Sequence, residues 1–139
     1  MILLVGSIIA WLPASASAEN VSKAERIARM AMSTASLWMI EHHEHEIVEG
    51  LEKGDLKEAV HEAEELIEWM KGTPWLADLE GPAKEATASA QKVHDRLSAK
   101  DRTGAESAIA VMREKFHHLH HELMEVVAGE GEGPSSHEH

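Results

Sequence analysis

Residues 109–126 read IAVMREKFHHLHHELMEV, and this stretch indicates most directly how the chain folds. Its apolar stripe recurs at alternating intervals of three and four residues: Ile109, Met112, Phe116, Leu119, Leu123 and Val126. That spacing places the stripe along one side of an α-helix, which is unstable alone and must be buried against other helices. The predicted helix covers 103–128, and four of the chain's 11 histidines lie within it.

Three further segments carry a stripe of the same kind, at 22–50, 55–71 and 82–99. The short stretches at 50–54 and 98–102 predict tight turns, which make the helices on either side antiparallel neighbours. Because each segment has one apolar face, the four must share a core. The sequence therefore predicts an all-α protein, an antiparallel up-down-up-down four-helix bundle.

Capping-box patterns predict helix starts at Ser22, Asp55 and Thr103, each followed three residues later by Glu. The third helix is predicted to start at Pro82, since proline suits the first helical position. The connection 72–82 is longer than the other two and is expected to hold one helical turn.

A weak internal repeat supports this organisation. A shift of 46 residues superposes three apolar pairs: Ile47 on Val93, Leu51 on Leu97, and Ala59 on Ala105. Two related helical hairpins joined in one chain would produce such a pattern.

Both ends of the chain read differently from the middle. Residues 1–18 are uncharged and apolar and end in Ala16-Ser17-Ala18, which predicts a secretory signal peptide. The bundle would then occupy 19–128, and the Gly-, Glu- and Ser-rich tail 129–139 is expected to be disordered. The expected location is periplasmic or secreted, without membrane insertion after signal cleavage.

Composition excludes several classes of function. With 13 basic and 25 acidic residues the formal net charge is −12, which disfavours nucleic acid and attracts cations. The absence of cysteine excludes disulfides, thiolate metal sites and covalently attached haem. No catalytic motif is present, so the chain is not expected to be an enzyme.

The histidines indicate metal binding, because imidazole and carboxylate are ligands for divalent transition ions. Glu44 falls on the predicted stripe of its helix, where an ionised carboxylate is costly unless it is paired or bound to a cation. The candidate ligands lie in two clusters and on the helices between them: Glu41, His42, Glu44, His45, His61, His94, His117, His118, His120 and His121.

Helix lengths predict which ligands share a height along the bundle. His45, His61 and His94 are expected at one level, and His120 lower down, near Met30 and Met32. His42, His43 and His45 are expected on the flanks or outside of their helix. On the last helix, His117 and His121 form one outward chelating pair, and His118 and Glu122 form another.

Residues 51–59, LEKGDLKEA, and 61–66, HEAEEL, resemble the repeats of small periplasmic His-rich metal-binding proteins. That resemblance implies a four-helix bundle that sequesters copper, nickel and similar ions.

Residues 112–120, MREKFHHLH, resemble the last helix of the b-type four-helix cytochromes and the related cytochrome c-prime bundle. This resemblance implies haem b held by His120, with Met30 or Met32 as the opposite ligand. The c-prime attachment motif is absent, since His117 and His120 stand where its cysteines would be.

The leading hypothesis is an exported buffer, carrier or sensor of a divalent ion, with Cu, Zn, Ni and Co all left open. Protonated imidazole cannot coordinate, so affinity should fall as the pH drops through the histidine range. The alternatives are a non-covalent haem-binding electron-transfer bundle and a helical interaction or chaperone-like module. Whether a homodimer shares a site between two chains is also open.

Overall fold

The computed structural model describes residues 14–132, with side chains described from 23 to 129. This part of the chain is helical except at its turns and forms a four-helix bundle. The elements, in chain order, are α2 (Ala14–Lys53), α3 (Leu56–Gly72), the 3₁₀ turn η1 (Ala77–Leu79), α4 (Glu80–Ser98) and α5 (Arg102–Glu132). The predicted helical turn in the long connection is confirmed by η1.

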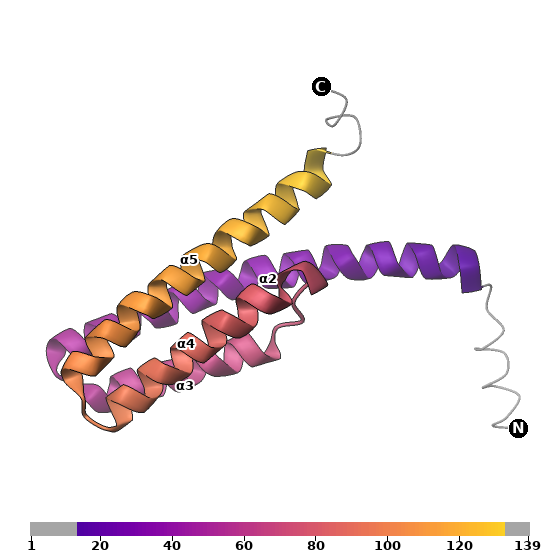
Figure 1. Ribbon diagram of the computed structural model, residues 1–139. Coiled ribbons are helices and arrows are strands. Elements are labelled where there is room, and N and C mark those ends of the chain that lie inside the picture. The colour runs from indigo at the N-terminus through magenta and orange to yellow at the C-terminus, as the bar shows by residue number, and fades with distance from the viewer. Residues whose placement is uncertain (1–13, 133–139) are drawn as a thin grey trace, which may run out of the picture.

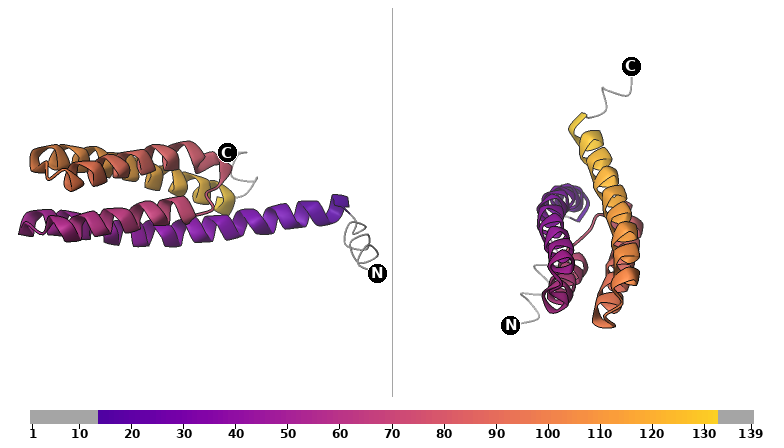
Figure 2. Two further views of the ribbon diagram at one scale, coloured as in Figure 1. Left: turned by 90° about the horizontal axis from the view of Figure 1, so that it is seen from below. Right: turned by 90° about the vertical axis from the view of Figure 1, so that its left-hand side faces the viewer.

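Consecutive helices pack on one another, α2 on α3, α3 on α4 and α4 on α5. The chain doubles back at each connection, so α2 with α3 forms one hairpin and α4 with α5 forms another (Figure 1). The ring closes through a sparser contact between α2 and α5. Figures 1 and 2 show why, since α5 diverges from α2 toward its C-terminal end.

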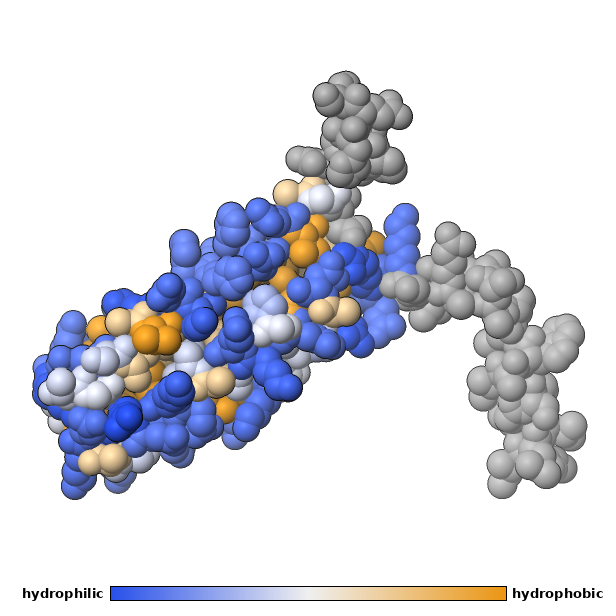
Figure 3. Space-filling view, viewed as in Figure 1, coloured by the Kyte–Doolittle hydropathy of each residue, from blue (hydrophilic) through white to orange (hydrophobic). Residues whose placement is uncertain are grey.

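The core is apolar and takes side chains from every helix. Its fully buried members include Ile40, Ile47, Leu66, Met70, Val93, Leu97, Met112, Leu119 and Leu123. The predicted stripe on α5 is confirmed, although Val126 is only half-buried where α5 leaves α2. Charged and polar residues cover most of the surface visible in Figure 3.

The turn between α2 and α3 is closed by two backbone hydrogen bonds and a helix cap. The Gly54 N–H donates to the Leu51 carbonyl (3.1 Å), and the Asp55 N–H donates to the Gly50 carbonyl (2.8 Å). This Schellman arrangement needs a residue with positive φ, which Gly54 supplies at 78°. Asp55 caps α3, as predicted, by accepting a hydrogen bond from the Glu58 N–H (3.1 Å).

The turn between α4 and α5 repeats these contacts with every residue shifted by 46. The Lys100 N–H donates to the Leu97 carbonyl (3.0 Å), and the Asp101 N–H donates to the Arg96 carbonyl (2.9 Å). Asp101 then accepts a hydrogen bond from the Gly104 N–H (2.9 Å). Lys100 takes the place of Gly54 with φ at 58°. The structure thus supports the internal repeat in backbone detail.

Three predicted helix starts are wrong. α2 runs without a break through Ser22, so no helix begins there. Asp101, rather than Thr103, caps α5, because its side chain stands one turn ahead of the first free N–H groups. α4 begins before Pro82, whose missing N–H costs nothing in the first turn.

The first and last helices extend beyond the predicted ends of the bundle, residues 19 and 128. Residues 14–18 of the predicted signal peptide form the start of α2, and residues 1–13 lie outside the described part. α5 continues to residue 132, so residues 129–132 are helical rather than disordered, and 133–139 lie outside the described part. No helix within the described range is long and apolar enough to cross a membrane.

The two equivalent turns predict opposite effects of exchanging their left-handed residues. Lys100→Gly should raise the free energy of unfolding by about 0.5 to 1 kcal/mol, because a side chain is strained at positive φ. Gly54→Lys should lower it by about 1 kcal/mol for the same reason. Urea denaturation of both variants tests this. A shift of both midpoints in the same direction would contradict the equivalence of the turns.

Candidate functional site

A cleft of about 230 Å³ lies between α2 and α5, where the two helices begin to separate. Its walls combine buried apolar side chains with charged and imidazole groups: Leu37, Ile40, Glu41, Glu44, Arg113, Phe116, His117 and His120. Four of these residues are metal ligands predicted from the sequence. We call this site the α2/α5 cleft.

Helix periodicity explains why these four polar side chains meet. Glu41 and Glu44 are three residues apart on α2, so both face α5. His117 and His120 have the same spacing on α5 and face α2. Each helix therefore contributes two ligand-type groups to the cleft. The prediction that His117 faces outward is wrong in part, since it is exposed but lies on the rim of the cleft.

Glu44 is the most buried charged group of the cleft, with 17% of its side chain exposed. Burial raises the pKa of Glu44 above its ordinary value, and the hydrogen bond and charge of Arg113 partly counter this rise. The Arg113 Nε donates to Glu44 Oε1 over 3.1 Å. Pairing with the Arg113 guanidinium thus offsets the free-energy cost of holding the Glu44 carboxylate on the apolar stripe.

Glu41 and His120 form the second contact across the cleft. His120 Nδ1 lies 3.6 Å from Glu41 Oε1, and about half of each side chain is exposed. This contact corrects the predicted height of His120, which lies opposite Glu41 rather than beside Met30 and Met32. The reason is that α5 crosses α2 at an angle (Figure 1), so equal residue counts do not give equal heights.

The other predicted ligands do not join this group. His42 is exposed, and His45 lies 3.7 Å from Glu49 of its own helix. His61 Nε2 lies 3.0 Å from Glu65, and His94 Nε2 lies 3.2 Å from Glu64 of α3. The three histidines expected at one level thus contact three different carboxylates.

The remaining histidines of α5 face solvent beside acidic residues one turn away. His118 lies 3.9 Å from Glu122 and His121 lies 3.2 Å from Glu125. Such pairs can chelate weakly without any tertiary structure.

The two methionines proposed as haem ligands lie elsewhere. Met30 packs partly buried against the core, and Met32 lines a separate cleft between α2 and α3. Met32 and His120 therefore line two different clefts.

Among residues 23–129, no three His, Asp or Glu side chains already converge closely enough to hold a metal ion. In the α2/α5 cleft the positive charge beside Glu44 is the guanidinium of Arg113. A divalent ion would have to replace that guanidinium, and Arg113 is free to leave because about half of its side chain is exposed.

The sequence prediction missed His43. It was expected on the flank or outside, but it is buried, with 6% of its surface exposed, and it faces α3. Its Nδ1 lies 2.6 Å from Glu62 Oε2. The signal that could have found it is its position three residues after Ile40 and four before Ile47, which is the spacing of one helix face.

Comparison with protein-family models, with curated proteins and with solved structures found no match to this chain. A function for this chain must therefore be inferred from its own side chains.

The pairing in the cleft predicts how Glu44 titrates. Arg113→Gln should raise the pKa of Glu44 further, because Arg113 is what holds it down. A carboxyl with a raised folded-state pKa stabilises the fold fully below its unfolded-state pKa and loses that stabilisation as the pH rises through the folded-state pKa. In the variant this loss should therefore occur at higher pH.

Carbon-13 NMR of the glutamate carboxyl groups, followed from about pH 3 to about pH 8, measures this pKa. Arg96→Gln is the matched control, because Arg96 pairs with Asp101 at the turn between α4 and α5 and not with Glu44. Equal titration of Glu44 in the two variants would show that Arg113 does not pair with it.

Proposed function

We propose that this chain binds a divalent transition metal ion, of the class of Zn, Cu, Ni or Co, in the α2/α5 cleft. The observation that carries the proposal is the meeting of two carboxylates and two imidazoles from facing helices at one cleft: Glu41, Glu44, His117 and His120. Imidazole and carboxylate together suit these ions, whereas thiolate is absent from the chain.

The spacing of the one direct contact supports this ligand set. Two ligand atoms that bind one ion at about 2.0 to 2.2 Å in tetrahedral geometry lie about 3.3 to 3.6 Å apart. Glu41 Oε1 and His120 Nδ1 lie 3.6 Å apart, close to that separation. Modest side-chain rotation would bring both onto one ion.

Capture would exchange one cation for another. The formal net charge of −12 raises the local concentration of cations around the bundle. An arriving ion would take the place of the Arg113 guanidinium beside Glu44, and Arg113 would turn into solvent. The buried carboxylate would then face two positive charges in place of one, and this gain opposes the energy needed to break the existing pair.

The expected export of the chain fits a role in binding ions outside the cytoplasm, where a buffer or carrier would meet them. This part of the proposal depends on the uncharged leader that ends in Ala16-Ser17-Ala18.

Two substitutions should change zinc affinity in opposite directions. The double variant His117→Ala/His120→Ala should weaken binding at least about tenfold, because it removes two ligands. Arg113→Gln should strengthen it roughly tenfold, since it removes a charge that repels the ion at short range. Isothermal titration calorimetry with zinc chloride at low ionic strength measures both effects.

The matched control is His118→Ala/His121→Ala, which removes two histidines from the outward side of the same helix. It should leave the tight binding event unchanged. Equal losses in the two double variants would mean that exposed histidines chelate zinc without the cleft, and the proposed site would be wrong.

A further inference from the structure

The buried ring of His43 is fixed in one orientation by Glu62 of α3. Its Nδ1 lies 2.6 Å from Glu62 Oε2, and only 7% and 14% of the two side chains are exposed. A carboxylate can only accept, so Nδ1 carries the proton in this hydrogen bond. In the neutral ring Nε2 then has a free lone pair.

That Nε2 atom has no hydrogen-bond partner although it is buried, a state it shares with one serine oxygen among the described side chains. The nearest charged group is the carboxylate of Glu65, with Oε2 at 3.9 Å. Two acceptors therefore face each other across a short gap, and His43 Nε2 is shielded from solvent. Because neither group can donate a hydrogen bond to the other, a positive charge between them would stabilise the pair.

A second imidazole stands on the far side of the same carboxylate. His61 Nε2 lies 3.0 Å from Glu65 Oε1, and the two residues are one turn apart on α3. His61 and Glu65 have 59% and 42% of their side chains exposed, so both can rotate. Rotation toward His43 would give an ion two nitrogens and one carboxylate.

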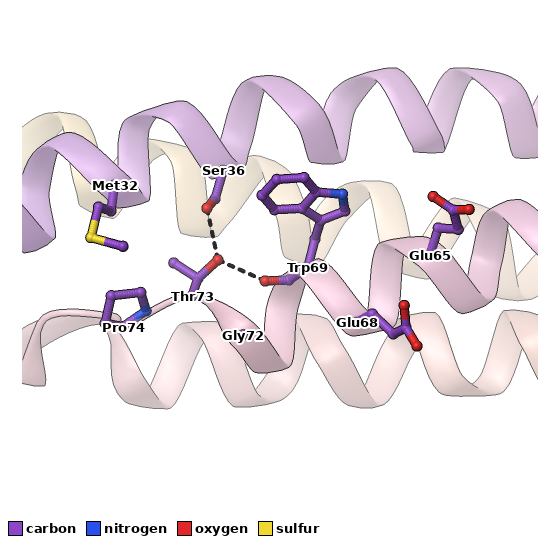
Figure 4. Close-up of a pocket in the computed structure, with 8 residues that line it drawn as sticks. All are labelled: Met32, Ser36, Glu65, Glu68, Trp69, Gly72, Thr73 and Pro74. Atoms are coloured by element: carbon purple, nitrogen blue, oxygen red, sulfur yellow. Dashed lines mark hydrogen bonds between the residues drawn. The ribbon is translucent and has the colours of Figure 1, made fainter.

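An ion could reach this place from solvent. Glu65 lines an open cleft of about 300 Å³ between α2 and α3, along with Ser36 and Trp69. Figure 4 shows Glu65 and the Trp69 ring both directed from α3 toward α2. The carboxylate thus stands between the open cleft and the buried histidine.

The second hairpin of the internal repeat packs without such a cluster. In the second hairpin, the positions equivalent to His43, His61, Glu62 and Glu65 are occupied by small or apolar residues: Ser89, Ser107, Ala108 and Val111. Ser89 is buried as His43 is. Burying His43 together with the Glu62 carboxylate is costly, so their presence in one hairpin only indicates a use other than packing.

We propose that His43, His61 and Glu65 bind a divalent transition metal ion at the α2/α3 packing surface, with Glu62 as the residue that positions the His43 ring. A carboxylate that holds the far nitrogen of a metal-binding imidazole fixes its tautomer and strengthens it as a ligand. This site shares no residue with the α2/α5 cleft, so each can fail without the other.

The repeat supplies the test variant, His43→Ser, which installs the residue that the second hairpin has at the equivalent buried position. Zinc binding to the full chain is followed by native mass spectrometry, with free zinc kept low by a chelator so that exposed histidine pairs stay empty. His43→Ser should bind one zinc ion fewer than the wild-type chain and keep the ion of the α2/α5 cleft. The variant His117→Ala/His120→Ala should show the converse.

Two further measurements separate a ligand role from a structural one. Glu62→Gln should keep the fold, as circular dichroism would show, and weaken zinc binding at this site about 10- to 100-fold. In nitrogen-15 NMR of the imidazole rings, zinc should shift the Nε2 signal of His43 and leave that of exposed His42 in place.

Equal numbers of zinc ions on the wild-type chain and on His43→Ser would overturn the proposal. So would a His43 ring that carries protons on both nitrogens and does not respond to zinc, because a proton would then be the charge that faces Glu65.

Discussion

Two chain reversals with matching hydrogen bonds hold the helices of this bundle in pairs. Each is flanked by a buried leucine before the turn and a buried alanine after it, Leu51 with Ala59 and Leu97 with Ala105. In the first hairpin the two helices approach closely at Gly50, where an added Cβ would lie 3.2 Å from both Cβ and N of Ala59. These turns fix the two helical hairpins. One candidate site lies within the first hairpin, and the other lies between the two hairpins.

Most of the fold could be predicted because it depends on local signals. The apolar stripes, the Asp55 cap and the turn at Gly54 are each determined by residues near in sequence, and each is found in the structure. The errors fall where two local signals compete. Thr103 matches a capping box, yet Asp101 takes the cap because the preceding turn delivers it there. Ser22 matches one too, but the residues before it are also helical.

The site could be predicted only in part, because it depends on how helices cross. Periodicity identified Glu44 as a buried carboxylate, and the structure adds the partner, Arg113, from the far helix. Periodicity failed for His43, because only one apolar stripe was assigned to α2, whereas α2 packs against both α3 and α5. It also failed for the height of His120, since residue counting assumes helices that run side by side whereas α5 diverges from α2.

Four helices around one core meet at four surfaces, but the chain supplies only three connections. The seam between α2 and α5 is the one without a covalent closure, so it can widen by moving one hairpin against the other while both tight turns keep their hydrogen bonds. The surface between α2 and α3 has no such freedom, because a turn joins its two sides. The bundle is therefore mechanically compliant along the α2/α5 edge and stiff along the adjacent α2/α3 edge.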